Sequence, residues 1–128
     1  MILARAFALI LLLTGGPAAA AAEKVPSFAD RQWAAARDFY NDEMVSGRCP
    51  IGFAKTEGGC SASAHGRKWA AGQPLPQSAI RFDLPHALVA RLGKPPAGYR
   101  YLRVGGDILL VSNKTKLVAD GITDLGRR

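Results

Sequence analysis

The fold is decided by the stretch Tyr99-Arg-Tyr-Leu-Arg-Val-Gly-Gly-Asp-Ile-Leu-Leu-Val111-Ser-Asn-Lys-Thr-Lys-Leu117-Val-Ala-Asp-Gly-Ile122. It contains three apolar-rich runs, at 99–104, 107–111 and 117–122, and Gly105-Gly106 separates the first two. A Gly-Gly pair can occupy the positive-φ positions of a two-residue hairpin turn without steric penalty. The stretch therefore predicts a three-stranded antiparallel meander that begins with a tight hairpin.

The turn also predicts the register of the hairpin, because each strand is counted outward from it. The expected pairs are Val104 with Asp107, Arg103 with Ile108, Leu102 with Leu109, and Tyr101 with Leu110. Alternate pairs lie on opposite faces, so one face gathers Leu102, Val104, Leu109 and Val111, and the other gathers Tyr99, Tyr101, Ile108 and Leu110. Both faces are apolar, and both need a cover.

The register of the third strand stays open, because the turn at 112–115 is ambiguous by one residue. A two-residue turn would place Asp107 opposite Asp120, and like charges directly opposite are unfavourable, so a longer loop is preferred. A short helix at 86–92 is expected to cover one face of the meander. The other face is left to the N-terminal helix or to a second copy of the chain, so a homodimer is an open alternative.

Two further elements are expected just before the meander. Residues 79–84 alternate Ile80, Phe82 and Leu84 with charged residues, which predicts a half-buried strand. Pro85 suits the first turn of the helix at 86–92, which Gly93 and a following Pro-Pro pair close. The segment 72–76 contains two prolines and is excluded from any helix interior.

A longer helix is predicted at 28–45. Ser27 is its expected N-cap, and Gly47 is placed to end it in the left-handed conformation. Its apolar stripe recurs at helical spacing and consists of Trp33, Ala36, Tyr40 and Met44. Packing against the rest of the domain is favoured over membrane binding, because the polar face of this helix carries mixed charges.

The first 22 residues have the order of a secretory signal peptide. A single cation, Arg5, precedes an apolar run at 6–13, and small residues lead to an expected cleavage after Ala22. A membrane anchor is less favoured, because Gly15, Gly16 and Pro17 break the segment short of the about 20 residues that span a bilayer. The mature chain is then expected in the periplasm with no transmembrane anchor, as a protein whose formal net charge falls from +7 to +6 with the loss of Arg5.

The stretch from 72 to 124, and above all Lys94 to Ile122, resembles the C-terminal module of the small periplasmic proteins grouped with the nickel/cobalt homeostasis protein RcnB. The resemblance implies an α+β fold and a role in nickel or cobalt homeostasis. It supplies no ligand motif that matches this chain. The predicted organisation is a signal peptide at 1–22, an N-terminal helix with a disulfide loop and linker at 23–71, and an RcnB-like β-rich module at 72–128.

Cys49 and Cys60 are the only cysteines of the chain, and a glycine-rich loop separates them. In an exported protein this spacing predicts a disulfide, and closing a loop of this length contributes about 3 kcal/mol. A redox pair is less favoured, because such pairs usually have two intervening residues. A thiolate metal site is also less favoured, because it normally gathers more than two strong ligands. A similar Cys-Pro-x-Gly-x-Ala-Lys stretch precedes the module in the proteins that this chain resembles.

The sequence points to few functional side chains. No catalytic motif is present, so no enzyme activity and no cofactor are expected. His65 and His86 are weak metal-ligand candidates, since no second histidine stands at a chelating spacing from either. The candidates for contact with an anionic surface are Arg67, Lys68, Arg100 and Arg103.

Two hypotheses for the function follow. The first is a non-enzymatic periplasmic protein that supports nickel/cobalt homeostasis through an unidentified envelope component. The second is a basic module that binds anionic cell-wall, lipid or polymer surfaces by electrostatic attraction. Nucleic acid is not an expected partner, because export separates the protein from its usual sources.

Overall fold

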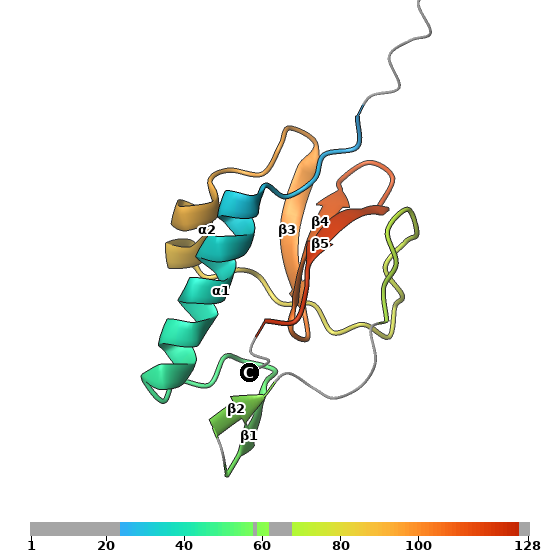
Figure 1. Ribbon diagram of the computed structural model, residues 1–128. Helices are drawn as coiled ribbons and strands as arrows, with labels where there is room; N and C mark the ends of the chain where they lie inside the picture. The colour runs from blue at the N-terminus through green and yellow to red at the C-terminus, as the bar shows by residue number, and fades with distance from the viewer. Residues whose placement is uncertain (1–23, 58, 62–67, 126–128) are drawn as a thin grey trace, which may run out of the picture.

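The computed structural model describes residues 24–57, 59–61 and 68–125 (Figure 1). Along the chain lie α1 (Asp30–Val45), β1 (Ala54–Thr56), β2 (Gly59–Ser61), α2 (His86–Leu92), β3 (Tyr99–Val104), β4 (Asp107–Ser112) and β5 (Val118–Ile122). The predicted α+β class is confirmed. The predicted signal peptide and its cleavage site at Ala22 lie outside the described residues, and the division of the chain at residue 72 stays a prediction.

The sheet is the antiparallel meander β3-β4-β5, and its first hairpin has the predicted register. Val104 pairs with Asp107 and Tyr101 with Leu110, and Gly105 has the positive φ, 57°, that the tight turn requires. In the third strand Asp120 pairs with Leu110, after a register shift between Leu110 and Val111. Asp107 and Asp120 are thus kept apart, as the like-charge argument predicted.

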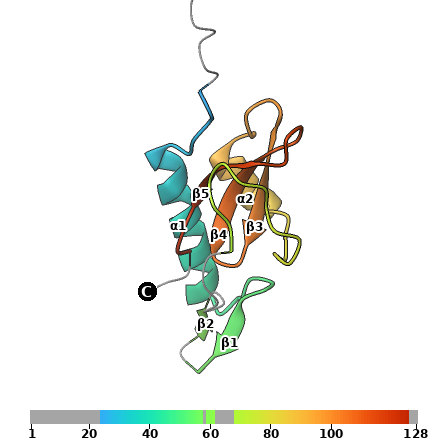
Figure 2. The ribbon, with the colours of Figure 1, turned by 90° about the vertical axis from the view of Figure 1, so that its right-hand side faces the viewer.

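Both helices pack on one face of the sheet, as Figures 1 and 2 show. The core on this face gathers buried side chains from α1, α2 and the three strands, among them Tyr40, Leu88, Tyr101, Ile108, Leu110 and Ile122. The expectation that α1 covers the opposite face is therefore wrong. The reason is that α1 and α2 contact each other side by side, so together they form one layer.

The opposite face is covered by the segment that precedes α2. Trp69 and Leu75 pack there on a smaller cluster of Leu102, Leu109, Val111 and Val118. Backbone hydrogen bonds fix this segment to β5, since the amide of Gly72 donates to the carbonyl of Val118 and the amide of Val118 donates to the carbonyl of Gln73. The chain itself thus covers the second apolar face.

Helix α1 begins two residues later than predicted. Its N-cap is Ala29, so the expected cap at Ser27 is wrong; the Gln32 side chain instead accepts a hydrogen bond from the Ala29 amide at 2.9 Å. At the other end Gly47 has φ 77° and the amide of Arg48 donates to the carbonyl of Glu43. This is a Schellman motif, and it confirms the predicted stop at Gly47.

The predicted strand at 79–84 is reduced to a single bridge. Phe82 exchanges both backbone hydrogen bonds with Arg103 of β3, whereas Ile80 leaves 71% of its surface exposed. Alternation of apolar and charged residues was therefore not enough to predict a strand here, because the segment pairs with the edge of the sheet at one residue only. Helix α2 has the predicted bounds, His86–Leu92, with Gly93 as its C-cap.

Candidate functional site

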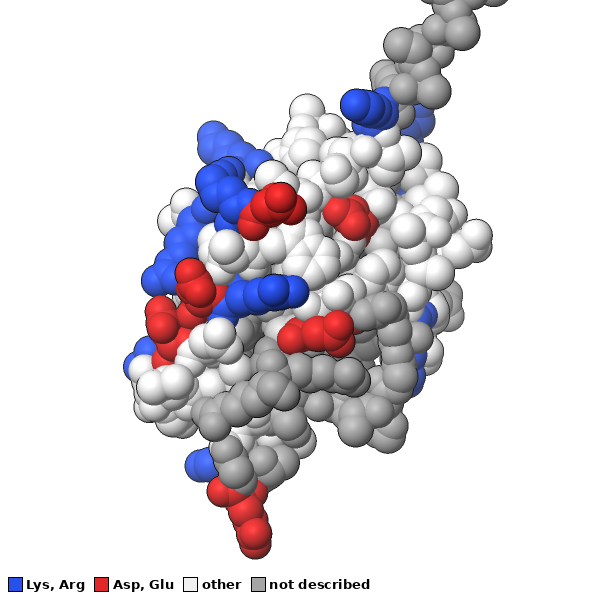
Figure 3. All heavy atoms as spheres, viewed as in Figure 1, with Lys and Arg blue, Asp and Glu red and all other residues white. Residues whose placement is uncertain are grey.

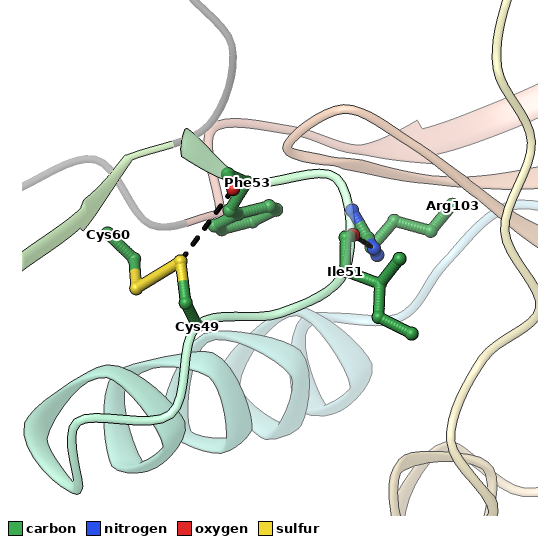
Figure 4. The surroundings of a disulfide bond; sticks show 5 residues. All are labelled: Cys49, Ile51, Phe53, Cys60 and Arg103. Carbon is green, nitrogen blue, oxygen red and sulfur yellow. Dashed lines mark hydrogen bonds between the residues drawn. A yellow bond between two sulfur atoms is a disulfide. The ribbon is translucent and has the colours of Figure 1, made fainter. Parts of the chain in front are cut away.

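The candidate site consists of the buried Arg103 and the groups around it, and the loop between α1 and β2 supplies part of these groups. Cys49 and Cys60 form a disulfide with a Cα–Cα distance of 5.5 Å, and Cys60 belongs to β2, which pairs with β1 in a small antiparallel hairpin. Figure 4 shows that the first half of this loop, from Cys49 to Phe53, runs close to the Arg103 side chain. The disulfide thus joins the start of the segment that lies near Arg103 to strand β2.

Arg103 is buried on the helix side of the sheet, with 3% of its surface exposed. Its Nη1 donates to the carbonyl of Gly105 at 2.8 Å, and its Nη2 donates to the carbonyl of Ile51 in the disulfide loop. The guanidinium carbon lies 5.1 Å from the centroid of the Phe53 ring and 4.6 Å from that of Phe82. Two carbonyl oxygens and two aromatic faces therefore surround the cation.

In the part of the chain that the structure describes, no carboxylate forms an ion pair with Arg103. Removal from water lowers the pKa of Arg103, and the nearby Tyr40 opposes this shift. An arginine remains charged in proteins nevertheless, so the loop and the sheet enclose a positive charge. Cation–π contacts and charge-assisted hydrogen bonds compensate part of the cost of its burial.

Tyr40 of α1 completes the cluster. Its ring stacks on Phe53 at 6.0 Å with an interplanar angle of 16°, and it makes an edge contact with Phe39. Its hydroxyl is buried and has no hydrogen-bond partner among residues 24–57, 59–61 and 68–125. Burial raises the pKa of Tyr40, while the charge of Arg103 acts in the opposite direction.

The proposed anion-contacting residues do not form one surface. Arg103 is inside the protein, so its placement among the exposed cations is wrong; it shares the face of Tyr101 and Ile108 because the strand alternates. Lys68 and Arg100 are exposed, and Arg100 is on the face that Trp69 covers. Arg67 lies outside the described residues.

The two candidate metal ligands also stand apart. His86 is exposed at the first residue of α2, and His65 lies outside the described residues. Within the described ranges, no three His, Cys, Asp or Glu side chains come together in a way that would hold a metal ion.

The helical side of the molecule carries charges of both signs. In Figure 3 lysine and arginine side chains lie along the side where α1 and α2 pack, and acidic side chains separate them. Arg48 pairs with Glu43 at 3.0 Å, and Arg91 approaches Asp42 at 4.0 Å. This side is therefore a mixed surface and no continuous basic patch.

Sequence reasoning missed the two aromatic rings that Arg103 contacts, Phe53 and Phe82, and the Tyr40 ring that stacks on Phe53. One signal was available: in the predicted register Arg103 stands opposite Ile108, on the face assigned to the core. An arginine at that position must be buried or must lie at the rim. The pattern could not show that β3 contacts the disulfide loop, because Ile51 precedes Arg103 by 52 residues in the chain.

No helix in the described part of the chain is long and apolar enough to cross a membrane.

Comparison with known families and structures supports the resemblance seen in the sequence. Residues 90–120, from the end of α2 into β5, match the family model RcnB, described as a nickel/cobalt transporter regulator. Among solved structures, the chain is similar to the C-terminal domain of inner membrane protein CigR from Salmonella enterica, with 21% identity over 73% of this chain and 86% of that one and a TM-score of 0.53. At this identity the likeness shows the fold.

Comparison with curated proteins gives no match. The resemblance to the RcnB family, predicted for residues 72–124, is thereby confirmed over residues 90–120.

Proposed function

We propose that this chain is a non-enzymatic periplasmic protein that supports nickel/cobalt homeostasis by acting on a component of the envelope. The observation that carries the proposal is the match of residues 90–120 to a family model described as a nickel/cobalt transporter regulator. A regulator acts on another protein, so the proposed role needs a partner and no catalytic group. The partner would be a component of metal transport.

The periplasmic location is supported by the disulfide between Cys49 and Cys60, because disulfides persist in oxidising compartments. The predicted signal peptide at 1–22 supplies the route. A fusion of the full chain to a reporter that is active only after export tests this step, with a fusion lacking residues 1–22 as its control. Equal reporter activity from both fusions would contradict the location.

The metal role is tested with a strain that lacks the gene and is challenged with nickel and cobalt. We expect its cellular nickel or cobalt content and its sensitivity to change, and the full-length chain to restore both. A chain lacking residues 1–22 is the matched control, since it keeps the folded part and loses the route of export. Unchanged metal content and unchanged sensitivity in the deletion strain would overturn the homeostasis role.

A second function is favoured by the exposed cations Lys68 and Arg100 and by the excess of basic residues in the whole chain. Here the protein binds an anionic envelope surface by electrostatic attraction, which salt screens. Sedimentation with anionic vesicles at rising salt tests it. The variant Lys68→Ala/Arg100→Ala should bind less, whereas Arg37→Ala/Arg48→Ala is the matched control, because Arg37 in α1 and Arg48 just after it lie on the mixed surface. Binding that is insensitive to salt would count against this function.

A further inference from the structure

We propose that the Cys49–Cys60 loop is a redox-sensitive cover, which holds the Arg103 guanidinium inside the protein while the disulfide is intact and exposes it to water when the disulfide is reduced. The inference goes beyond the proposed function, because it concerns when a particular cation becomes part of the protein surface. Figure 4 shows the arrangement on which it depends.

The loop supplies half of the groups that enclose the cation. Of the two carbonyl oxygens that accept from Arg103, one belongs to Ile51 in the loop and the other to Gly105 in the hairpin turn. Of the two aromatic rings, Phe53 is in the loop and Phe82 is in the segment bridged to β3. Departure of the loop would leave Arg103 attached to its own hairpin and to Phe82, with one side open to water.

The closed state is opposed by the charge it buries. A guanidinium that leaves water without a carboxylate partner loses hydration, which hydrogen bonds and aromatic contacts only partly replace. When the loop opens, the guanidinium of Arg103 is hydrated again. Opening therefore removes the cost of burying this charge. The disulfide favours the closed state by limiting the conformations open to the loop. The balance between the two states therefore depends on the disulfide.

The loop also lies directly on Phe82. Gly52 has φ +89°, and a Cβ at this position would be 2.6 Å from Cε2 of Phe82 and 2.8 Å from its Cζ. The backbone of the loop thus packs on the ring with no space for a side chain. This contact gives a way to lift the cover without changing either cysteine.

The redox step is thiol–disulfide exchange with a dithiol reductant. The thiolate of the reductant attacks one sulfur of the Cys49–Cys60 bond, forming a mixed disulfide and releasing the other sulfur as a thiolate. The second thiol of the reductant then displaces the first cysteine. The reductant is oxidised to its own disulfide by two electrons, and Cys49 and Cys60 take up two protons as free thiols.

The experiment measures how fast an arginine-specific dicarbonyl reagent modifies Arg103 in the purified protein, read residue by residue by mass spectrometry. Reduction with dithiothreitol should speed modification of Arg103 about tenfold or more, as expected when a local opening becomes populated. The exposed Arg100 is the internal control and should react at the same rate in both states. Amide hydrogen exchange of Leu109 and Leu110 in β4 should stay slow after reduction.

Two outcomes would overturn the proposal. An unchanged rate at Arg103 would show that the loop stays closed without the disulfide. Loss of protection in β4 together with the rise at Arg103 would show that the disulfide holds the whole fold rather than a cover.

A second measurement uses the oxidised protein. Gly52→Ala should raise the reactivity of Arg103 with the disulfide intact, since its Cβ cannot fit against Phe82. Gly98→Ala is the matched control: Gly98 also has a positive φ, 83°, but nothing lies within 4 Å of its Cβ position. Equal reactivity of Arg103 in the two variants would contradict the assignment of the loop as its cover.

Discussion

Arg103 shows how a charged side chain at a core-facing position of a strand is held inside the protein. Strand alternation places it beside Tyr101 and Ile108, under the two helices. At that position its charge meets the rings of Phe53 and Phe82 and two backbone carbonyls. Among the described residues, several weak contacts therefore take the place of the single carboxylate that would ordinarily accompany a buried cation.

The hydroxyl of Tyr40 beside this cluster gives a first prediction. It is buried and lacks a partner among the described residues, so its removal abolishes a desolvation cost without breaking a hydrogen bond. Tyr40→Phe should leave stability at pH 7 unchanged or raise it by about 1 kcal/mol. Urea unfolding followed by circular dichroism measures the change. A loss of stability of more than about 1 kcal/mol would mean that the hydroxyl has a hydrogen-bond partner in the folded protein.

The same residue predicts a dependence on alkaline pH. Burial raises the pKa of Tyr40, and it also raises that of Tyr101, whose hydroxyl donates to the carbonyl of Gly93. The folded state therefore keeps these protons more tightly, and their contribution is complete below the ordinary tyrosine pKa of about 10. Stability should fall as pH rises through the folded pKa values. Tyr40→Phe should show a shallower fall than the unchanged protein; equal slopes would contradict the role of Tyr40.

At the scale of the elements, local chemistry made α2 and the hairpin predictable. The Gly-Gly turn determines the pairing of β3 with β4, and Pro85 and Gly93 bound α2. The segment 79–84 shows where such reasoning ends, because a strand needs a neighbour along its length. Only Phe82 has one, and Ile80 is exposed. Alternation describes which residues would share a face and does not say whether a partner strand is present.

The C-terminal end of α1 gives a prediction about a single glycine. Gly47 adopts φ 77° after the last turn, and its Cβ position is open, so a substitution there meets backbone strain and no steric clash. Gly47→Ala should cost about 1 kcal/mol. Asn tolerates the left-handed region better, so Gly47→Asn should cost less. Thermal unfolding of both variants measures the difference, and the reverse order would contradict the assignment of the Schellman motif.

The packing of β5 gives a prediction of a different kind. A Cβ on Gly121 would be 2.5 Å from Cη2 of Trp69 and 3.0 Å from Cδ2 of Leu109. Gly121→Ala should therefore overpack the second face and cost about 1–3 kcal/mol. It should also shift the fluorescence of Trp69 by moving its ring toward water. Gly98→Ala is the control, and an equal fluorescence shift in that variant would show that the effect is not due to the contact with Trp69.

At the scale of the whole molecule, the sequence identified two apolar faces but not what covers them. Helix α1 has an apolar stripe that fits either face, and the choice depends on its contact with α2. Trp69 lies in a polar segment with no periodic pattern, so nothing local indicated that it packs on Leu109. The disulfide loop is similar: the cysteine pairing was predicted from the composition and the expected compartment, whereas the position of the loop over Arg103 depends on the tertiary fold.

The cover over the second face predicts the state of association. Because Trp69 and Leu75 shield Leu102, Leu109, Val111 and Val118, the protein should be a monomer at micromolar concentration. Trp69→Ala removes this shield and the hydrogen bond from its Nε1 to the Asp107 carboxylate at 2.8 Å. We expect it to cost about 3 kcal/mol and to promote self-association through the exposed face. Light scattering coupled to size exclusion measures both proteins, with Trp33→Ala on the helical side as the matched control. A stable dimer of the unchanged protein would show that a second copy, and not the chain alone, completes the cover.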